Sequence, residues 1–131
     1  MSGEWTVYVD GSSNKTTCGA GIILEGSDDL ILEQTPNLEF KDTNNQVENE
    51  VILVGLSLAY DMGAREVMCK SDSQLVVGQI KGDFEVRKPL LQWYYHTVSN
   101  LVAQFKRVTM EHIRREDNMR VDALYQLATT K

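Results

Sequence analysis

Four acidic residues lie far apart in the sequence, yet each falls where a strand is predicted to end or a helix to begin: Asp10, Glu48, Asp72 and Asp122. Carboxylate oxygens are hard ligands, which suit Mg²⁺ or Mn²⁺ better than zinc, because zinc prefers nitrogen and sulfur. Two such cations about 3.5 to 4 Å apart can activate a water molecule and stabilise the leaving oxygen of a phosphodiester. If the fold gathers these carboxylates, the pattern predicts a nuclease site.

Each of the four carboxylates also has an ordinary structural interpretation, and the residues alone leave both open. Asp10 with Gly11 could be no more than a turn. Glu48 could cap its helix or pair with a distant arginine, and Asp72 could cap the helix that follows it. Asp122 could simply favour the positive end of the last helix. The alternatives differ in one testable respect, since only the site hypothesis requires the four to meet.

The strands that would position these residues are predicted from apolar alternation. Residues 4–12 read as a central strand that the pair Asp10-Gly11 brings to an end, and short turns join it to strands over residues 17–25 and 30–34. Three strands on short turns imply an antiparallel meander. Later strands over residues 65–71 and 108–113 alternate with helices, which requires parallel pairing through right-handed crossovers. We therefore expect an α/β protein with a mixed five-stranded sheet and helices on its faces.

Four helices are predicted. A capping box at Thr43 and Gln46 begins a helix that runs to about Met62 and Gly63, and a short helix spans residues 72–80. Pro89 opens a long helix, and a last helix runs from residue 117 to about 129. The long helix is expected to pack through an apolar row at helical spacing: Leu91, Tyr95, Val98, Val102 and Phe105.

Helical geometry separates two glutamates of the first helix. Glu48 heads a row with Ile52 and Gly55 that borders the apolar face, whereas Glu50 falls with Ser57 on a face predicted to meet solvent. A charged carboxylate on a buried face is costly unless a cation accompanies it. Glu48, and not Glu50, is therefore the candidate ligand.

Length and composition suit a single domain over residues 1–131, with 42% apolar residues and only two prolines. The first three residues are either native or a remnant in front of a domain cut from a longer polyprotein. No apolar run is long enough to span a membrane, and the N-terminus lacks the pattern of a signal peptide. We expect an intracellular monomer, cytoplasmic or nuclear, with no membrane partner.

The charge and the two cysteines set further limits. A net charge of −6 counts against strong nonspecific binding of nucleic acid by this domain alone, although basic residues gather around 81–88 and 106–120. Cys18 and Cys69 fall in strands expected to flank the first one, roughly 9.6 Å apart and beyond the reach of a disulfide. We expect both to be free thiols.

Four ordered segments resemble the signatures of type I ribonuclease H, and the match spans essentially the whole chain. They are Tyr8-Val9-Asp10-Gly11-Ser12, Thr43-Asn44-Asn45-Gln46-Val47-Glu48, Ser71-Asp72-Ser73-Gln74-Leu75-Val76 and Asn118-Met119-Arg120-Val121-Asp122-Ala123-Leu124. The chain looks most like the compact ribonuclease H domains of gypsy-class retrotransposon reverse transcriptases and similar short cellular forms. The resemblance implies a ribonuclease H-like fold with strand order 3-2-1-4-5 and strand 2 antiparallel.

The resemblance also implies an activity and a set of residues that carry it. Two Mg²⁺ ions, for which Mn²⁺ can substitute, would be held by Asp10, Glu48, Asp72 and Asp122, and the RNA strand of an RNA/DNA hybrid would be hydrolysed. Specificity would rest on sensing the ribose 2′-hydroxyl. The implied substrate contacts are the backbone of Gly11 to Ser13, including Ser12, together with Asn44, Asn45, Gln74 and Asn118.

Two departures from the family pattern bear on function. Only residues 81–89 link the two middle helices, where larger members carry a basic protrusion, so a covalently adjacent polymerase domain is the expected source of hybrid affinity. His112 stands six residues before Asn118, like a mobile histidine proposed to assist product release in the family. The strand register could equally put His112 inside the fifth strand and leave Arg114 or Arg115 in the loop. His96 is expected to be structural or exposed.

Two other functions compete with a hybrid ribonuclease. A catalytically silent module that tethers or binds within a reverse transcriptase would typically lose the carboxylates, and this chain keeps all four. A DNA nuclease or integrase-like transferase on the same fold is disfavoured by the Thr-Asn-Asn-Gln stretch at residues 43–46 and by the Asn-x-x-x-Asp pattern at residues 118–122.

Overall fold

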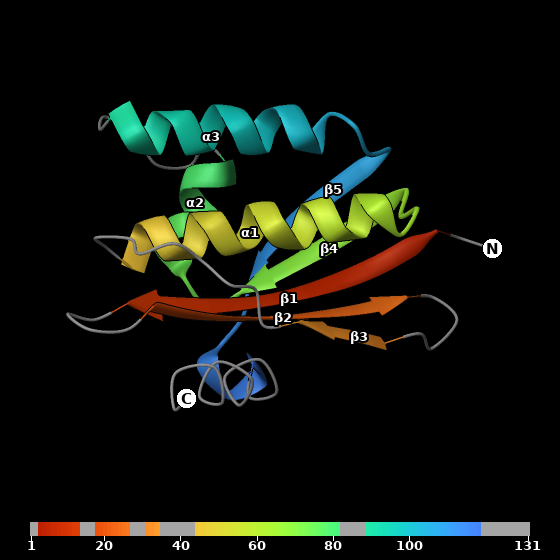
Figure 1. The fold of residues 1–131 in the computed structure, drawn as a ribbon, viewed down its shortest axis with the longest axis horizontal. Coiled ribbons are helices and arrows are strands. Elements are labelled where there is room, and N and C mark those ends of the chain that lie inside the picture. Colours follow the sequence, from red (N-terminus) through yellow and green to blue (C-terminus); the bar gives the residue numbers. More distant parts are fainter. Residues whose placement is uncertain (1–2, 14–17, 27–30, 35–43, 82–88, 119–131) are drawn as a thin grey trace.

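In the part of the chain that the computed structural model describes, five strands form one mixed sheet, and three α-helices lie on one side of it (Figure 1). The structure describes residues 3–13, 18–26, 31–34, 44–81 and 89–118. The strands are β1 (Glu4–Ser13), β2 (Cys18–Gly26), β3 (Ile31–Gln34), β4 (Glu66–Ser71) and β5 (Arg107–His112). Their order in the sheet is β3-β2-β1-β4-β5, which is the predicted order.

The pairing of the strands also follows the prediction. β2 is antiparallel to β1 and to β3, whereas β4 is parallel to both β1 and β5. Parallel neighbours need crossover helices, and these supply the layer that covers the sheet. The carboxyl ends of β1, β4 and β5 consequently share one edge, which we call the carboxyl rim.

The predicted end of β1 at Asp10-Gly11 was wrong. β1 continues to Ser13, and its antiparallel register with β2 runs on past Asp10 to the pair Ser13 and Cys18. The parallel register with β4 does stop at Val9 and Ser71. An Asp-Gly pair need not turn where a neighbouring strand still offers hydrogen bonds, so β2 decides the length of β1. Asp10 nevertheless lies at the carboxyl rim, because β4 ends beside it.

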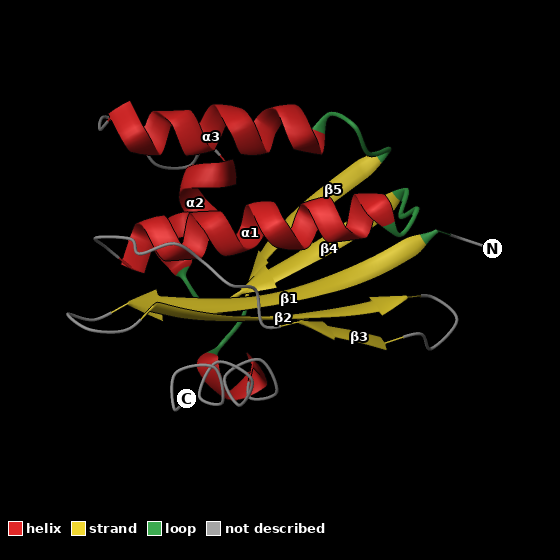
Figure 2. Cartoon of the chain, in the orientation of Figure 1, coloured by secondary structure: helices red, strands yellow, loops and turns green. Residues whose placement is uncertain are grey.

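The helices are α1 (Asn44–Asp61), α2 (Gln74–Lys81) and α3 (Pro89–Val102), with a short 3-10 helix η1 (Arg115–Asn118) after β5. Figure 2 shows α1, α2 and α3 together on one side of the sheet and η1 on the other. Of the predicted last helix, residues 117 and 118 belong to η1, and the remainder lies outside the described residues. The prediction of helices on both faces of the sheet is therefore confirmed only in part. No helix in the described ranges has the length and apolar character needed to cross a bilayer.

The close approach of α1 to β1 depends on a glycine. A Cβ atom built on Gly55 would lie 3.0 Å from Val7 Cγ1 and 3.2 Å from Val9 Cγ1, so a larger residue would require the valine side chains or the helix to shift by a few tenths of an ångström. Around this contact the fully buried core includes Val7, Val9, Val51 and Ile52. The tight packing holds the first turns of α1 over the sheet, next to the carboxyl rim.

The end of α1 matches the predicted stop. Gly63 adopts a φ of 85°, a left-handed conformation that favours glycine. Its N–H donates to Tyr60 O and that of Ala64 donates to Ala59 O, both at 3.0 Å. This pair of bonds is the Schellman motif, which satisfies the last carbonyls of a helix and turns the chain toward β4.

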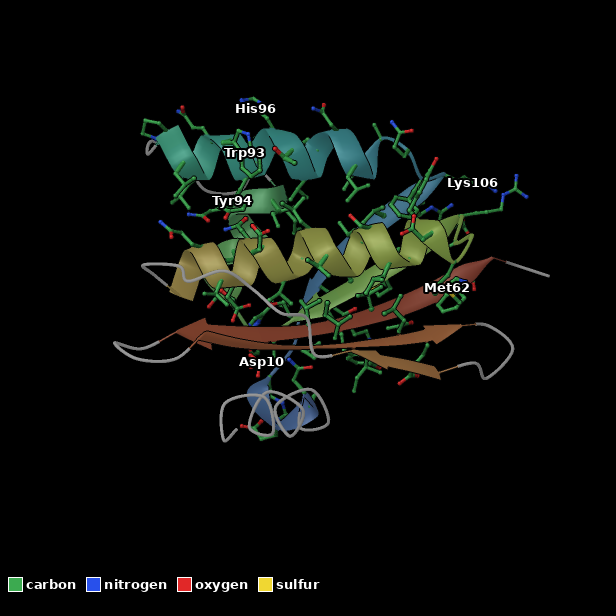
Figure 3. The ribbon with its side chains drawn as sticks, in the orientation of Figure 1. Asp10, Met62, Trp93, Tyr94, His96 and Lys106 are labelled. Carbon is green, nitrogen blue, oxygen red and sulfur yellow. The ribbon has the colours of Figure 1, made fainter. Side chains whose placement is uncertain are left out.

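The packing of α3 corrects two predictions. Tyr94 and Val98 are its buried residues, whereas Tyr95 of the predicted row is only partly buried. Tyr94 reaches toward α1 (Figure 3), where its hydroxyl donates a 2.9 Å hydrogen bond to Glu50 Oε2. Glu50 is therefore half-buried between two helices, not on a solvent face, because α3 covers that side of α1. Burial and the neighbouring Glu50 carboxylate raise the pKa of Tyr94.

The cysteines lie on the two strands that flank β1, as predicted. Cys18 opens β2 opposite Ser13, and Cys69 lies in β4 beside Val7. Cys69 is a free buried thiol, and burial raises its pKa to about 12. The side chain of Cys18 is not among those the structure describes.

Candidate metal centre at the carboxyl rim

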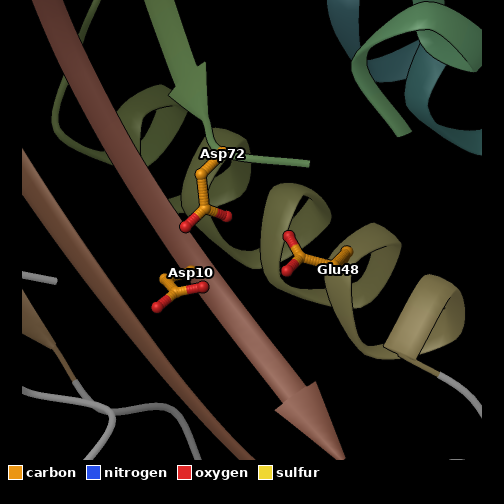
Figure 4. Close-up of side chains that lie close together, drawn as sticks. All are labelled: Asp10, Glu48 and Asp72. Atoms are coloured by element: carbon orange, nitrogen blue, oxygen red, sulfur yellow. The ribbon is translucent and has the colours of Figure 1, made fainter. Parts of the chain in front are cut away.

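Three of the four predicted carboxylates meet at the carboxyl rim. One ligand oxygen from each of Asp10, Glu48 and Asp72 can be chosen so that all three lie within 4.8 Å of one another. Figure 4 shows the side chains converging from β1, from α1 and from the end of β4. Asp10 and Glu48 are only 5% and 7% exposed, and Asp72 is partly buried. Residues 38 and 24 positions apart in the chain thus form one acidic pocket.

Each carboxylate reaches the pocket by a simple structural route. Asp10 follows Val9, the last β1 residue paired with β4, and Asp72 follows Ser71, the matching last residue of β4. Adjacent parallel strands lie about 4.8 Å apart, so consecutive residues at their ends must be neighbours. Glu48 lies in the second turn of α1, which the contact at Gly55 holds close to β1. The sheet register and one helix contact therefore suffice to build the cluster.

The capping interpretation of Asp72 is not what the structure shows. Ser73 caps α2, since its Oγ accepts a 3.3 Å hydrogen bond from Val76 N. Ser71 Oγ in turn accepts a 3.1 Å hydrogen bond from Ser73 N. The predicted start of this helix at residue 72 was accordingly too early, and α2 begins at Gln74. The two serines fix the turn, which leaves the Asp72 carboxylate to face Asp10 and Glu48.

Asn118 lies inside the rim and not on its surface. It is 1% exposed, and its Nδ2 donates a 3.1 Å hydrogen bond to the carbonyl oxygen of Val9. Among the described residues its Oδ1 accepts no hydrogen bond. The bond joins residues 109 positions apart and fastens η1 to β1 immediately before Asp10.

The carboxylate cluster does not include three other predicted residues, Gln74, His112 and Arg114. Gln74 is exposed at the start of α2, beside the carboxylate cluster in sequence. His112 is exposed and is the last residue of β5, paired with Ser71, so the alternative that kept it within the strand describes its position. Arg114 then lies in the loop, where it contacts Asp117 at 3.2 Å and Glu116 at 3.5 Å, and these acids raise its pKa.

Most of the other predicted residues lie outside the described residues, either entirely or in their side chains. Asp122 lies outside the described residues, and so do the residues that link α2 to α3. Gly11 and Ser12 belong to β1, and Asn44 and Asn45 to the first turn of α1, but their side chains are not described. His96 is exposed on the outer side of α3, away from α1 (Figure 3), as expected.

The chemistry of the pocket fits a divalent cation. All three groups offer oxygen atoms, which is the ligand type that Mg²⁺ and Mn²⁺ prefer. Two of the groups are almost fully buried, where ionised carboxylates at this spacing repel one another strongly. A bound cation reverses that energetic penalty. The residues present therefore fit a divalent cation.

Some structural features of the site were not anticipated from the sequence. Gly55 was assigned to the correct row, but its role in letting α1 approach β1 was not recognised, although a small residue on a sheet-facing row is a readable signal. The bond between Tyr94 and Glu50 joins residues 44 positions apart. No local sequence pattern predicts such a contact, because the contact depends on how α1 and α3 pack.

Comparison with known proteins agrees with the fold. Residues 8–128 match the family model described as reverse transcriptase-like. The chain is 30% identical to ribonuclease HI of Halobacterium salinarum over 124 residues, which cover 93% of this chain and 62% of that protein. It therefore spans less than two thirds of the length of this curated relative.

Solved structures of similar proteins superpose closely. The crystal structure of RNase H1 from Halobacterium salinarum gives a TM-score of 0.86 at 28% identity and covers 94% of this chain and 95% of that one. That of LC11-RNase H1 in complex with an RNA/DNA hybrid gives 0.84 at 25% identity, with 96% of each chain covered. The chain therefore belongs to the reverse transcriptase-like family and, within it, to the type I ribonuclease H proteins.

Proposed function

We propose that the protein is a metal-dependent endonuclease that hydrolyses the RNA strand of RNA/DNA hybrids. The observation that carries the proposal is the meeting of Asp10, Glu48 and Asp72 within 4.8 Å at the carboxyl rim. Family membership supports the reaction, and the hybrid bound to LC11-RNase H1 supports the substrate class. A silent binding module would have no need for three converging carboxylates, two of them buried, because their mutual repulsion lowers stability.

The residues of the chain have distinct parts in the proposed reaction. Asp10, Glu48 and Asp72 would hold the cation, and Asp122 would complete the set of ligands. Divalent cations bound there would activate the attacking water and offset the charge that develops on the phosphate. The chain itself supplies rigid ligand positions: Asp10 and Asp72 stand on adjacent strand ends, and Glu48 stands on a helix held down at Gly55.

Substrate recognition is proposed for residues around the pocket. Gln74 is exposed next to Asp72, and Asn44 and Asn45 begin the helix that carries Glu48, so all three border the pocket in sequence. Amide side chains can both donate to and accept from a ribose 2′-hydroxyl in the minor groove, which distinguishes RNA from DNA. The backbone of Gly11 to Ser13 extends β1 beyond the cluster, toward the same substrate.

Three finer points belong to the same proposal. Two cations, and not one, would act together, with Mn²⁺ able to replace Mg²⁺. His112, exposed at the end of β5 next to the rim, would assist product release. A covalently adjacent polymerase domain would supply hybrid affinity, which agrees with the net charge of −6 of this chain. A retrotransposon reverse transcriptase remains our proposed setting.

The proposal is tested by incubating the protein with labelled RNA/DNA hybrid, duplex RNA and duplex DNA in Mg²⁺ or Mn²⁺. We expect cleavage of RNA only within the hybrid, and none after chelation of the metal. Because the domain is acidic, the assay should include low salt and high protein concentration. Absence of cleavage under those conditions would favour the binding module, and cutting of DNA would favour the transferase or DNA nuclease.

A further inference from the structure

The segment after β5 holds the backbone in front of two of the carboxylates. Ile113 N donates a 2.9 Å hydrogen bond to the carbonyl oxygen of Ser71, and Asn118 Nδ2 donates a 3.1 Å bond to that of Val9. Ser71 directly precedes Asp72, and Val9 directly precedes Asp10. Residues 113–118 therefore contact the strand ends at the two peptide groups that lead into the pocket.

A bond to these carbonyls has a direct effect on the carboxylates. The peptide group is planar, so the carbonyl of Val9 and the N–H and Cα of Asp10 move as one unit. A donor fixed against Val9 O thus limits rotation of the Asp10 backbone and of the side chain it carries. Val9 and Ser71 are both fully buried, which shields their hydrogen bonds from competition by water.

Only one of the two donors is a side chain. Ile113 donates through its backbone N–H, so this hydrogen bond does not depend on the Ile113 side chain. The hydrogen bond to Val9 O, in contrast, depends on the side-chain amide of Asn118. Asn118 is 1% exposed, so burying this polar group without a bond would be costly. Its position inside the rim is that of a group that orients other residues, not of one that touches a nucleic acid.

We propose that Asn118 is a positioning residue for the metal centre, acting through the carbonyl of Val9 on the ligand Asp10. The inference rests on the proposed function, since it assigns a role within that same site. It replaces the substrate contact implied for Asn118 by the family resemblance. Residues 113–118 are thereby fixed to the strand that carries Asp10.

The test compares Asn118→Ala and the similarly sized Asn118→Leu with the parent protein. Mn²⁺ affinity is measured by calorimetry in the absence of substrate, and kcat and KM are measured on the hybrid. Loss of a group that orients a metal ligand typically weakens metal binding about 10- to 100-fold. We expect Mn²⁺ affinity and kcat to fall about tenfold or more in both variants, with KM within about twofold of the parent.

Val98→Ala is the matched control. Val98 is fully buried in α3, so its truncation lowers stability without touching the rim. We expect this variant to keep the parent's Mn²⁺ affinity and kcat. Equal losses in Val98→Ala and in the Asn118 variants would show a general effect of stability and overturn the proposal. A raised KM with unchanged Mn²⁺ affinity would instead identify Asn118 as a substrate contact and would also overturn it.

The parent protein offers a second measurement that does not depend on a variant that folds. In NMR spectra the side-chain amide protons of Asn118 should exchange slowly and shift on titration with Mg²⁺, in step with the backbone amide of Asp10. Fast exchange, or no shift while Asp10 responds, would overturn the inference. A parent that binds Mn²⁺ but never cleaves a hybrid would refute the proposed function alone, since the binding measurements still test Asn118.

Discussion

The two ends of the β1 and β4 pair both carry acidic residues, but they use them in opposite ways. At the amino end Glu66 lies beside Arg107 of β5, with 3.6 Å between Oε1 and Nη2, and the arginine side chain is 71% exposed. At the carboxyl rim Asp10 and Asp72 face each other and Glu48, with oxygens within 4.8 Å. One end pairs an exposed arginine with a glutamate whose side chain is 20% exposed, and the other gathers like charges in a partly buried pocket.

The energies of the two arrangements explain the difference. An ion pair at the protein surface, such as that of Glu66 with the exposed Arg107, contributes about 0 to 1 kcal/mol. Two charged carboxylate oxygens within 4.8 Å of each other repel by about 3.5 kcal/mol or more at an effective dielectric constant of about 20. A fold does not maintain such repulsion without a compensating function. Acidic residues alone therefore do not mark the site, whereas the convergence of buried acidic side chains does.

The sharpest contrast is between Asp72→Asn at the rim and Glu66→Gln at the amino end. We expect Asp72→Asn to lower the rate of hybrid cleavage at least about 10³-fold, because the site loses a ligand that stabilises the transition state. Without metal its melting temperature should be equal to or above that of the parent, since repulsion is relieved. Asp10→Asn should behave alike.

Glu66→Gln serves as the control in the same assays. It should retain full activity and lose at most about 1 kcal/mol of stability. An Asp72→Asn variant as active as the parent would remove Asp72 from the ligand set and erase the contrast between the two ends.

The next contrast lies within α1, between Glu48→Gln and Glu50→Gln. We expect Glu48→Gln to lose about 100-fold or more in cleavage rate, because Glu48 faces the metal pocket. Glu50→Gln should be nearly silent, since a glutamine oxygen can still accept the bond from Tyr94. Single-turnover rates at saturating Mg²⁺ measure both. Equal losses would mean that the two sides of α1 are not functionally distinct.

Gly55→Ala tests whether the packing of α1 on β1 positions Glu48 at the carboxyl rim. The added methyl group would meet the Val7 and Val9 side chains at 3.0 and 3.2 Å, so these side chains or α1 must shift by a few tenths of an ångström, and we expect a cost of about 1 to 3 kcal/mol. Denaturant unfolding measures that loss. We also expect weaker Mn²⁺ binding, because Glu48 moves with α1. Gly63→Ala is a useful comparison. An alanine is strained at the φ of 85° that Gly63 adopts, but this position lies at the end of α1 away from Glu48. The variant should therefore lose stability while keeping Mn²⁺ affinity.

The smallest effect concerns Cys69, which lies in β4 between the two ends. Burial raises the pKa of its thiol from 9.0 to about 12. Its contribution to stability is therefore complete below pH 9 and falls as the pH rises toward 12, by about 1.4 kcal/mol per pH unit at most. Between pH 9 and 10 the free energy of unfolding should decline less steeply in Cys69→Ala, measured in a Cys18→Ser background. Identical slopes would refute the assigned cause.

Much of this architecture could be predicted from the sequence. The order of strands followed from the turn spacing, the alternation with helices and the family resemblance, and the facing of Glu48 followed from helical periodicity. The end of β1 could not be predicted at Asp10, because pairing with β2 overrides the local turn signal of Asp10-Gly11. Local chemistry predicts where a chain can turn, and the neighbouring strand decides whether it does.

Contacts between distant segments were the part the sequence did not reveal. Glu50 was predicted to face solvent, and only the docking of α3 through Tyr94 buries it. Asn118 was placed in the last predicted helix, but no local pattern predicted that its side-chain amide donates a hydrogen bond to the carbonyl oxygen of Val9. Ser73 replaced Asp72 as the helix cap, although both residue types suit that position. In each case several side chains met the local requirement, and three-dimensional packing selected one.

The most direct test of the central claim is a crystal structure of the protein soaked in Mn²⁺, with the metal located by its anomalous scattering. We expect a strong peak within coordination distance, about 2.0 to 2.3 Å, of oxygens from Asp10, Glu48 and Asp72. Mn²⁺ bound elsewhere, with these three carboxylates bare at saturating metal, would contradict it.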